Sequence, residues 1–207
     1  VATSRFAAGG FATVVVGFAL PLIALSVTGA FLPYDVSVAL LIVPTLVSNL
    51  FQSLRQGHAA ALETFRRFWR MNLGLAVAIA ISAQLVVALP DRLLFGIIGV
   101  SVTFFGITQL AGWRPALPTA RHRAVVETAV AVVGGFFGGL SGIWGPPLIV
   151  YLLALNMPKE EMVRAQSLSF LLGSVVLLFA HLHSGILNAV TLPVSAWMTV
   201  PTMVCMF

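Results

Sequence analysis

Residues 134 to 158 read GGFFGGLSGIWGPPLIVYLLALNMP, an apolar stretch that Gly-Ile-Trp-Gly-Pro-Pro interrupts at its centre. Proline removes a backbone donor and glycine loosens a helix, so the hexapeptide predicts a helix break. In a bilayer such a break persists only where the freed backbone groups face protein or a water-filled cavity. A weaker copy of the stretch lies about 125 residues earlier. Matching breaks in two halves of a membrane protein are a strong sequence indication of a transport site.

Composition defines the class of protein. The chain is 59% hydrophobic and carries only 11 basic and 6 acidic residues in 207, whereas about a quarter of a soluble domain is charged. Each charge-free interval is long enough for the ~20 residues of a helical span. The last interval is twice that length and divides at the turn-forming run His183 to Asn188, which gives seven apolar segments. The intervals are Phe6 to Tyr34, Val36 to Leu54, Met71 to Pro90, Leu93 to Trp113, Thr128 to Pro158 and Ala165 to Phe207.

An internal repeat organises these segments. Gly9-Gly10-Phe11 recurs as Gly134-Gly135-Phe136, and Pro21-Leu22-Ile23 recurs as Pro147-Leu148-Ile149. Leu32-Pro33 then matches Met157-Pro158. The order predicts an all-α integral membrane protein, a polytopic bundle of two four-helix repeats whose first helices are broken. We assign residues 1–114 to the first repeat and 124–207 to the second, and we expect an eighth helix beyond Phe207.

The basic residues predict orientation. If every segment crosses, eight of them share one side and three share the other, and the richer side is cytoplasmic. If the two broken segments were re-entrant hairpins instead, nine basic residues would lie on one side of the membrane and two on the other. The sequence leaves both topologies open. In the first reading the two groups are Arg5, Arg55, Arg66, Arg67, Arg70, Arg114, Arg121 and Arg123 against Arg92, Lys159 and Arg164.

Each half of the chain carries a series of motifs in the same order. The second half carries Gly142-Ile143-Trp144-Gly145-Pro146-Pro147-Leu148, then Met157-Pro158 and Arg164-Ala165-Gln166-Ser167. The first half carries Gly17-Phe18-Ala19-Leu20-Pro21, Leu32-Pro33, and Pro44-Thr45 through Asn49 and Gln52 to Arg55-Gln56-Gly57. With these motifs the chain resembles the TauE/SafE sulfite-exporter family, whose usual pattern has further glycines where this chain has Trp144 and Pro146. The resemblance implies a carrier or channel for small anions such as sulfite, sulfonates and sulfoacetate-like compounds.

Polar stripes predict where the anion binds. Thr45, Ser48, Asn49 and Gln52 share one helical face, and Gln166, Ser169, Gly173 and Ser174 form a less regular stripe. A polar stripe is costly in lipid and should face inward, where the broken segments would offer backbone N–H groups to an anion. The alternatives are hydroxyls bonded to their own helix, amides that join helices, and a Trp144 that fills the core. The predicted substrate-binding residues are Phe18, Pro21, Thr45, Asn49, Gln52, Gly142, Trp144, Gly145, Pro146, Pro147, Gln166 and Ser167.

The sequence argues against catalysis. His58, His122, His181 and His183 lack the spacing of a zinc hydrolase, and neither a nucleophile elbow nor a phosphate-binding loop is present. We expect no enzyme activity, no metal, no cofactor and no nucleic-acid partner. We expect a multi-pass protein of the bacterial plasma (inner) membrane with cytoplasmic basic loops, in contact with lipids and a small organic or inorganic anion. An accessory structural subunit of a larger membrane complex is the alternative function, and a homo-oligomer stays open.

Overall fold

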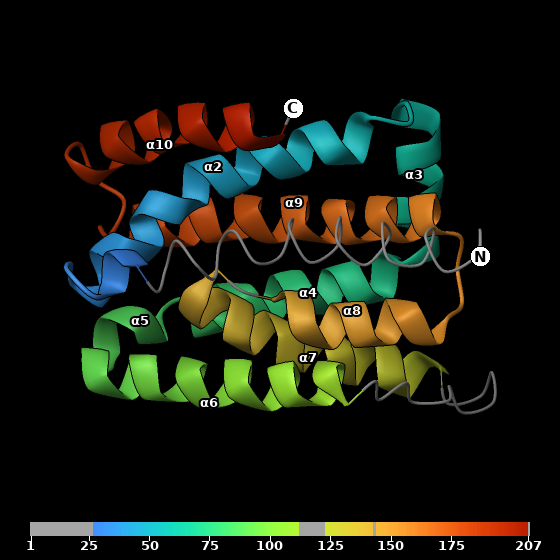
Figure 1. The fold of residues 1–207 in the computed structure, drawn as a ribbon, viewed down its shortest axis with the longest axis horizontal. Coiled ribbons are helices and arrows are strands. Elements are labelled where there is room, and N and C mark those ends of the chain that lie inside the picture. Colours follow the sequence, from blue (N-terminus) through green and yellow to red (C-terminus); the bar gives the residue numbers. More distant parts are fainter. Residues whose placement is uncertain (1–26, 112–122, 143, 207) are drawn as a thin grey trace.

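The computed structural model describes residues 27–111, 123–142 and 144–206, and every regular element in these ranges is a helix. The helices lie side by side as an elongated bundle (Figure 1). Within the described ranges, five stretches are long and apolar enough to cross a membrane: Tyr34–Leu54, Trp69–Ala88, Asp91–Thr108, Arg123–Ser141 and Lys159–His183. The elements are α2 (Tyr34–Leu54), α3 (His58–Arg67), α4 (Trp69–Ser82), α5 (Leu85–Ala88), α6 (Asp91–Leu110), α7 (Arg123–Ser141), α8 (Gly145–Ala154), α9 (Lys159–His183) and α10 (Thr191–Met206).

These helices confirm the prediction of an all-helical, multi-pass membrane protein. The outward surfaces of α6 and α10 carry large apolar side chains such as Val100 and Trp197, which are 72% and 77% exposed. Such surfaces suit contact with lipid acyl chains. Most of the first apolar segment falls in residues 1–26, outside the described residues. The count of seven spans and the duplication therefore stay predictions.

The prolines that the sequence pairs across the two halves occupy equivalent positions. Pro33 precedes α2 with φ −54° and ψ 153°, and Pro158 precedes α9 with φ −53° and ψ 142°. Each helix then has acidic residues in its first turn, Asp35 in α2 and Glu160 in α9. A negative charge there favours the N-terminal end of the helix dipole. The two helices thus begin in the same way.

The break within residues 134–158 turns the chain back on itself. Helix α7 ends at Ser141, where Gly142 adopts φ +71°, a conformation that side chains rarely tolerate. Near the end of α8 the Tyr151 hydroxyl donates to Glu127 Oε1 at 2.6 Å, in the second turn of α7. The two helices are therefore antiparallel. Ten residues of α8 span about 15 Å, so α8 begins roughly halfway through a ~30 Å hydrocarbon core.

This hairpin corrects the predicted arrangement of the loops. With every segment crossing, the sequence places Lys159 and Arg164 on the side opposite the basic loops. In the structure Arg164 Nε donates to Thr64 Oγ1 of α3 at 2.7 Å, and Arg67 pairs with Glu161. The start of α9 and helix α3 therefore lie at one end of the bundle (Figure 1). The physical reason is that α7 and α8 together return to their starting end, as in the hairpin reading that the sequence left open.

The basic residues consequently concentrate at the α3 end. Arg92 starts α6 at the opposite end, where the Tyr34 hydroxyl of α2 also donates to the Leu140 carbonyl of α7 at 2.6 Å. By the positive-inside tendency, the α3 end is predicted to be cytoplasmic. The described residues at that end are Arg55, Arg66, Arg67, Arg70, Arg123, Lys159 and Arg164, while Arg5, Arg114 and Arg121 lie outside the described residues.

Cysteine labelling tests this orientation. In a Cys205→Ala background, Arg66→Cys and Lys159→Cys should both be shielded from an impermeant thiol reagent in intact cells. Ala189→Cys, exposed in the turn after α9, should react. Labelling would be followed by mass shift before and after cell lysis. Reaction of Lys159→Cys without Arg66→Cys would contradict the hairpin, and reaction of both without Ala189→Cys would reverse the orientation.

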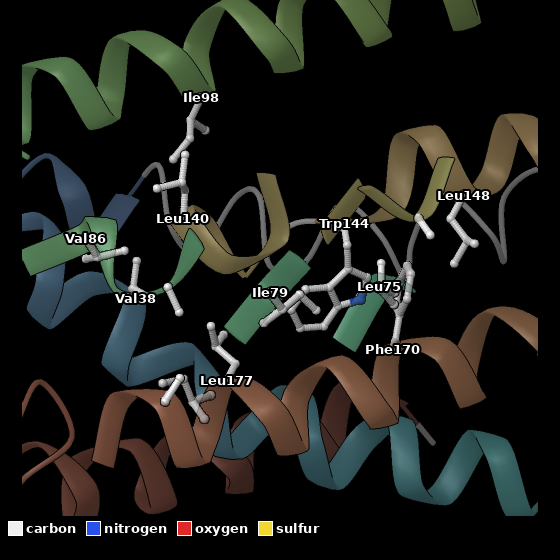
Figure 2. Close-up of a cluster of buried hydrophobic side chains, with 14 of the residues drawn as sticks. Val38, Leu75, Ile79, Val86, Ile98, Leu140, Trp144, Leu148, Phe170 and Leu177 are labelled. Carbon is white, nitrogen blue, oxygen red and sulfur yellow. The ribbon is translucent and has the colours of Figure 1, made fainter. Parts of the chain in front are cut away.

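The core is centred on Trp144, which is 1% exposed. Figure 2 shows its indole between Leu75 and Ile79 of α4 and Phe170 of α9. The Trp144 and Phe170 rings meet edge to face, with centroids 5.7 Å apart. Glycine makes this packing possible, because a Cβ on Gly138 would lie 2.6 Å from Trp144 Cε3. The helix break is thus anchored in the middle of the bundle.

Candidate functional site

A polar seam, formed by the facing sides of α2 and α9, is the main candidate site. At the α3 end, the Gln56 side chain accepts a hydrogen bond from the Arg164 guanidinium. One to two turns further in, Ser167 Oγ lies 3.3 Å from Gln52 Oε1. Deeper still, Thr45 and Ser174 line one pocket. Residue numbers fall on α2 as they rise on α9, so the helices are antiparallel and their polar faces meet from the α3 end to mid-bundle.

Several seam residues are deeply buried. Asn49 is 5% exposed, Ser167 is 2% exposed and Ser174 is 1% exposed. The inward orientation expected for the α2 stripe is therefore present at Asn49. The side chain of Asn49 makes no hydrogen bond to another of the described residues. Its amide atoms are not among the fully enclosed unpaired atoms of the described residues, so a polar ligand or water can reach them.

Arg164 supplies positive charge at the outer end of the seam. Its guanidinium is half-buried and its partners, Thr64 Oγ1 and Gln56 Oε1, are neutral. The two ion pairs found among the described residues, Arg67 with Glu161 and Arg123 with Glu127, do not involve it. A charge held by neutral groups keeps its attraction for anions. The sequence analysis used Arg164 for topology and as part of a family motif, but did not include it among the substrate-binding residues.

The pocket at the inner end of the seam joins the predicted stripes to the helix break. Thr45, Gly142, Trp144 and Ser174 line it together. On the side away from the seam it is bounded by apolar residues, namely Val38, Leu41, Ile42 and Leu177. Its volume of about 10 Å³ holds roughly one water. The structure is therefore a closed conformation at this point, in which an oxyanion needs the helices to separate before it can enter.

Trp144 combines the two roles that the sequence left open. Its indole fills the core against Phe170, and the same residue lines the pocket beside Thr45. The indole N–H makes no hydrogen bond to the described residues, and it is not among their fully enclosed unpaired atoms. It is a donor that cannot accept, which suits an anion better than a cation.

The first turn of α8 contributes less than the sequence suggested. Gly145, Pro146 and Pro147 are all buried, but the prolines have no N–H, so this turn offers few donors. Pro146 and Pro147 line a second pocket, with Phe137 and Ser141 of α7 and with residues of α6. That pocket is separate from the one beside Thr45. Phe18 and Pro21, the corresponding residues of the first half, lie outside the described residues.

The predicted α9 stripe divides between two neighbouring helices. Ser167 and Ser174 face α2, whereas Ser169 Oγ donates to Asn72 Oδ1 of α4 at 2.6 Å. Gln166 is also buried, at 9% exposure. Ser167 and Ser174 lie 2.7 Å from carbonyls one turn back, of Val163 and Phe170, so part of their hydrogen bonding is local as the alternative reading held.

Two buried residues with an amide or carboxylate side chain were not singled out from the sequence. Asn72 is 1% exposed and joins α4 to α9, and its signal was a lone amide in an apolar segment. Glu127 is 5% exposed and accepts from Tyr151 and from Arg123 Nε at 3.0 Å. In the sequence Glu127 lies next to the end of an apolar segment, where a charged side chain is expected to be exposed. Asn72 adds an amide close to the site, while Glu127 closes the base of the α7–α8 hairpin.

A multi-pass helical bundle with a half-length helix at its centre and a buried polar seam beside it has the build of a membrane transporter. Comparison with protein families is consistent with that class. The family model described as "Sulfite exporter TauE/SafE" matches residues 3–207. The chain therefore belongs to the TauE/SafE sulfite exporter family, as its motifs indicated. Comparison with curated proteins and with solved structures gives no match.

Proposed function

We propose that this protein exports a small oxyanion, such as sulfite, a sulfonate or a sulfoacetate-like compound, across the bacterial inner membrane. The observation that carries the proposal is the α2–α9 seam, which leads from Arg164 to the pocket beside Trp144. An anion would enter from the α3 end, attracted by Arg164, and would bind where Thr45, Asn49 and Trp144 come closest. Family membership favours this reading over an accessory subunit.

Neutral donors suit transport better than a fixed positive charge at the binding point. Between Gln52 and Trp144 the seam presents amides, hydroxyls and an indole, whereas Arg164 stands at the entrance. A transported ion must bind well enough to enter and weakly enough to leave. A buried arginine at the pocket would hold the anion, while several neutral hydrogen bonds can be exchanged one at a time. The arrangement supports movement along the seam.

The membrane potential is a sufficient driving force for export. An inside-negative potential favours anion exit by about 2.3 kcal/mol per charge per 100 mV. The seam side chains between Gln52 and Trp144 are uncharged, and the buried carboxylate Glu127 is engaged by Arg123 and Tyr151 away from the seam. A proton relay along this path therefore lacks a carboxylate among the described residues. We infer potential-driven uniport.

Flux into liposomes tests the proposal. The purified full chain, reconstituted in liposomes, should move sulfite down an imposed potassium diffusion potential. The direction should reverse with the sign of the potential and should persist when the pH gradient is collapsed. Transport that requires a pH gradient at zero potential would refute uniport. If monodisperse protein moved none of sulfite, sulfoacetate, taurine-derived sulfonates or small carboxylates, the exporter proposal would fail.

A further inference from the structure

His181 is the most anomalous polar side chain in the described part of the bundle. It is 0% exposed, and neither Nδ1 nor Nε2 has a hydrogen-bond partner among the described residues. Among the described residues these two ring nitrogens are the only fully enclosed side-chain nitrogen or oxygen atoms without a partner, whereas Ser169 on the same helix is bonded to Asn72. Buried polar groups in native proteins almost always find a partner, so each exception calls for an explanation. A structural histidine would ordinarily be oriented by a carbonyl or a hydroxyl.

The position of His181 relates it to the pocket beside Trp144. On α9, Ser174, Leu177 and His181 follow at intervals of three and four residues, so they share one helical face. Ser174 and Leu177 line the pocket. His181 therefore lies one turn beyond Leu177, towards the end of the bundle opposite α3.

An apolar barrier separates the pocket from His181. Leu177 lines the pocket together with Val38 and Ile42 of α2, and all three belong to the same cluster of buried apolar side chains. Figure 2 shows Leu177 and Val38 close together in the same cluster. Beyond them, the chain after α9 folds back, and the Leu187 N–H donates to the His181 carbonyl at 3.0 Å. The order along this path is polar seam, pocket, apolar barrier and then a single unpaired imidazole.

We propose that His181 is an exit-side contact for the oxyanion, which it meets after the Leu177 barrier opens. This inference rests on the proposed export function. A neutral imidazole has one N–H, which can donate to an oxyanion oxygen or to a water that accompanies it. In the closed structure the unpaired, buried imidazole raises the free energy of the protein. Opening of the end opposite α3 would hydrate the imidazole, so His181 also favours the open conformation over the closed one.

Substitution of His181 by leucine distinguishes a histidine that contacts the anion from a buried histidine that has no part in transport. Both roles predict that His181→Leu melts at a higher temperature, because an unsatisfied polar side chain is replaced by an apolar one. Only the exit-contact role predicts a loss of transport. His181→Gln keeps an N–H donor on a side chain of comparable reach and should retain most of the flux.

The experiment compares sulfite flux and melting temperature in liposomes for the wild type, His181→Leu, His181→Gln and the control His183→Leu. His183 is exposed two residues later on the same helix. We expect roughly tenfold lower flux for His181→Leu and near wild-type flux for the other two. The apparent affinity of His181→Leu should fall more for sulfite supplied from the end opposite α3. Wild-type flux that is unchanged in His181→Leu would overturn the inference alone, while an inactive wild type would overturn the export function as well.

Discussion

Gly139→Ala is expected to weaken the fold more than any other single-methyl addition in the bundle. A Cβ at Gly139 would lie 2.0 Å from Ser82 Oγ, 2.7 Å from the Ile79 carbonyl oxygen and 2.8 Å from the Ala83 nitrogen. Two of these atoms are backbone atoms, one within α4 and one in the residue that caps its C-terminus, and they cannot rotate away. The methyl group must therefore push α4 and α7 apart, and these two helices share the most extensive contact in the bundle.

The expected magnitude follows from overpacking. Extra methyl groups in packed cores cost about 1–3 kcal/mol, partly offset by up to ~1 kcal/mol of helix propensity when alanine replaces glycine. Separation of α4 from α7 also disturbs the hydrogen bond from Ser82 Oγ to the Gly135 carbonyl, 3.1 Å long. The net effect should lower the melting temperature in detergent by several degrees and reduce the monodisperse fraction.

Gly96→Ala is the matched control for this prediction. Gly96 lies within α6, and a Cβ there would have no atom within 4 Å. Only the higher helix propensity of alanine then affects stability, so Gly96→Ala should be neutral or slightly stabilising. Fluorescence-monitored melting of both variants gives the comparison. Equal melting of Gly139→Ala and the wild type would show that α4 and α7 are less tightly packed than described.

Helix ends were predictable wherever apolar runs stop at turn-forming residues. The interval from Val36 to Leu54 corresponds to α2, and the turn expected at His183 to Asn188 separates α9 from α10. The break at Gly142 to Pro147 was also recognisable, because glycine with positive φ and paired prolines leave few alternatives.

Charge-free intervals underestimated the spans that contain paired charges. Helix α7 begins at Arg123 rather than Thr128, because Glu127 is neutralised by Arg123 and bonded by Tyr151. Helix α9 begins at Lys159 rather than Ala165, because Arg164 finds partners on α3. Arg123 is only four residues from Glu127, but Tyr151 is 24 residues from Glu127, and Thr64 is 100 residues from Arg164. Local sequence carries no record of these two distant partners.

The same limit applies to the candidate site. The amphipathic spacing of Thr45, Asn49 and Gln52 was enough to predict an inward face, since the period of a helix fixes which residues align. Helix α9 bonds to both α2 and α4 through its polar side chains. The helical period alone does not determine how α4 packs beside α9, so the sequence did not predict this division. The hairpin between α7 and α8 was likewise undetermined, because both topologies place the main basic loops on one side.

Replacing Asn49 with leucine is expected to cause the largest loss of transport for the smallest structural change. Asn49 is buried in the seam beside the Gln52–Ser167 contact, and its side chain is not used to bond another described residue. Leucine has a similar size and no hydrogen-bond donor. A lost hydrogen bond to a charged ligand costs about 1.5–3 kcal/mol, or roughly tenfold to a hundredfold in affinity.

Asn49 tests anion binding more directly than Trp144 does. Trp144→Ala would also reduce transport, but Trp144 is a fully buried core side chain, and its removal costs about 3–5 kcal/mol of stability in well-packed proteins. A loss of flux in that variant would not distinguish binding from packing. Gln52→Leu is a useful companion, since it removes the amide that lies next to Ser167 and should reduce sulfite affinity in the same direction.

Gln84→Leu provides the control, because Gln84 is an exposed amide just after α4. The wild type, Asn49→Leu, Gln52→Leu and Gln84→Leu would be reconstituted at equal density. Their initial sulfite flux would be measured over a range of concentrations at a fixed potential. Asn49→Leu should raise the half-saturating concentration at least tenfold while its melting temperature stays close to that of the wild type, since leucine is of similar size and the Asn49 side chain bonds no other described residue. If Asn49→Leu and Gln84→Leu transport sulfite equally well, the seam amides serve helix packing and the anion crosses elsewhere.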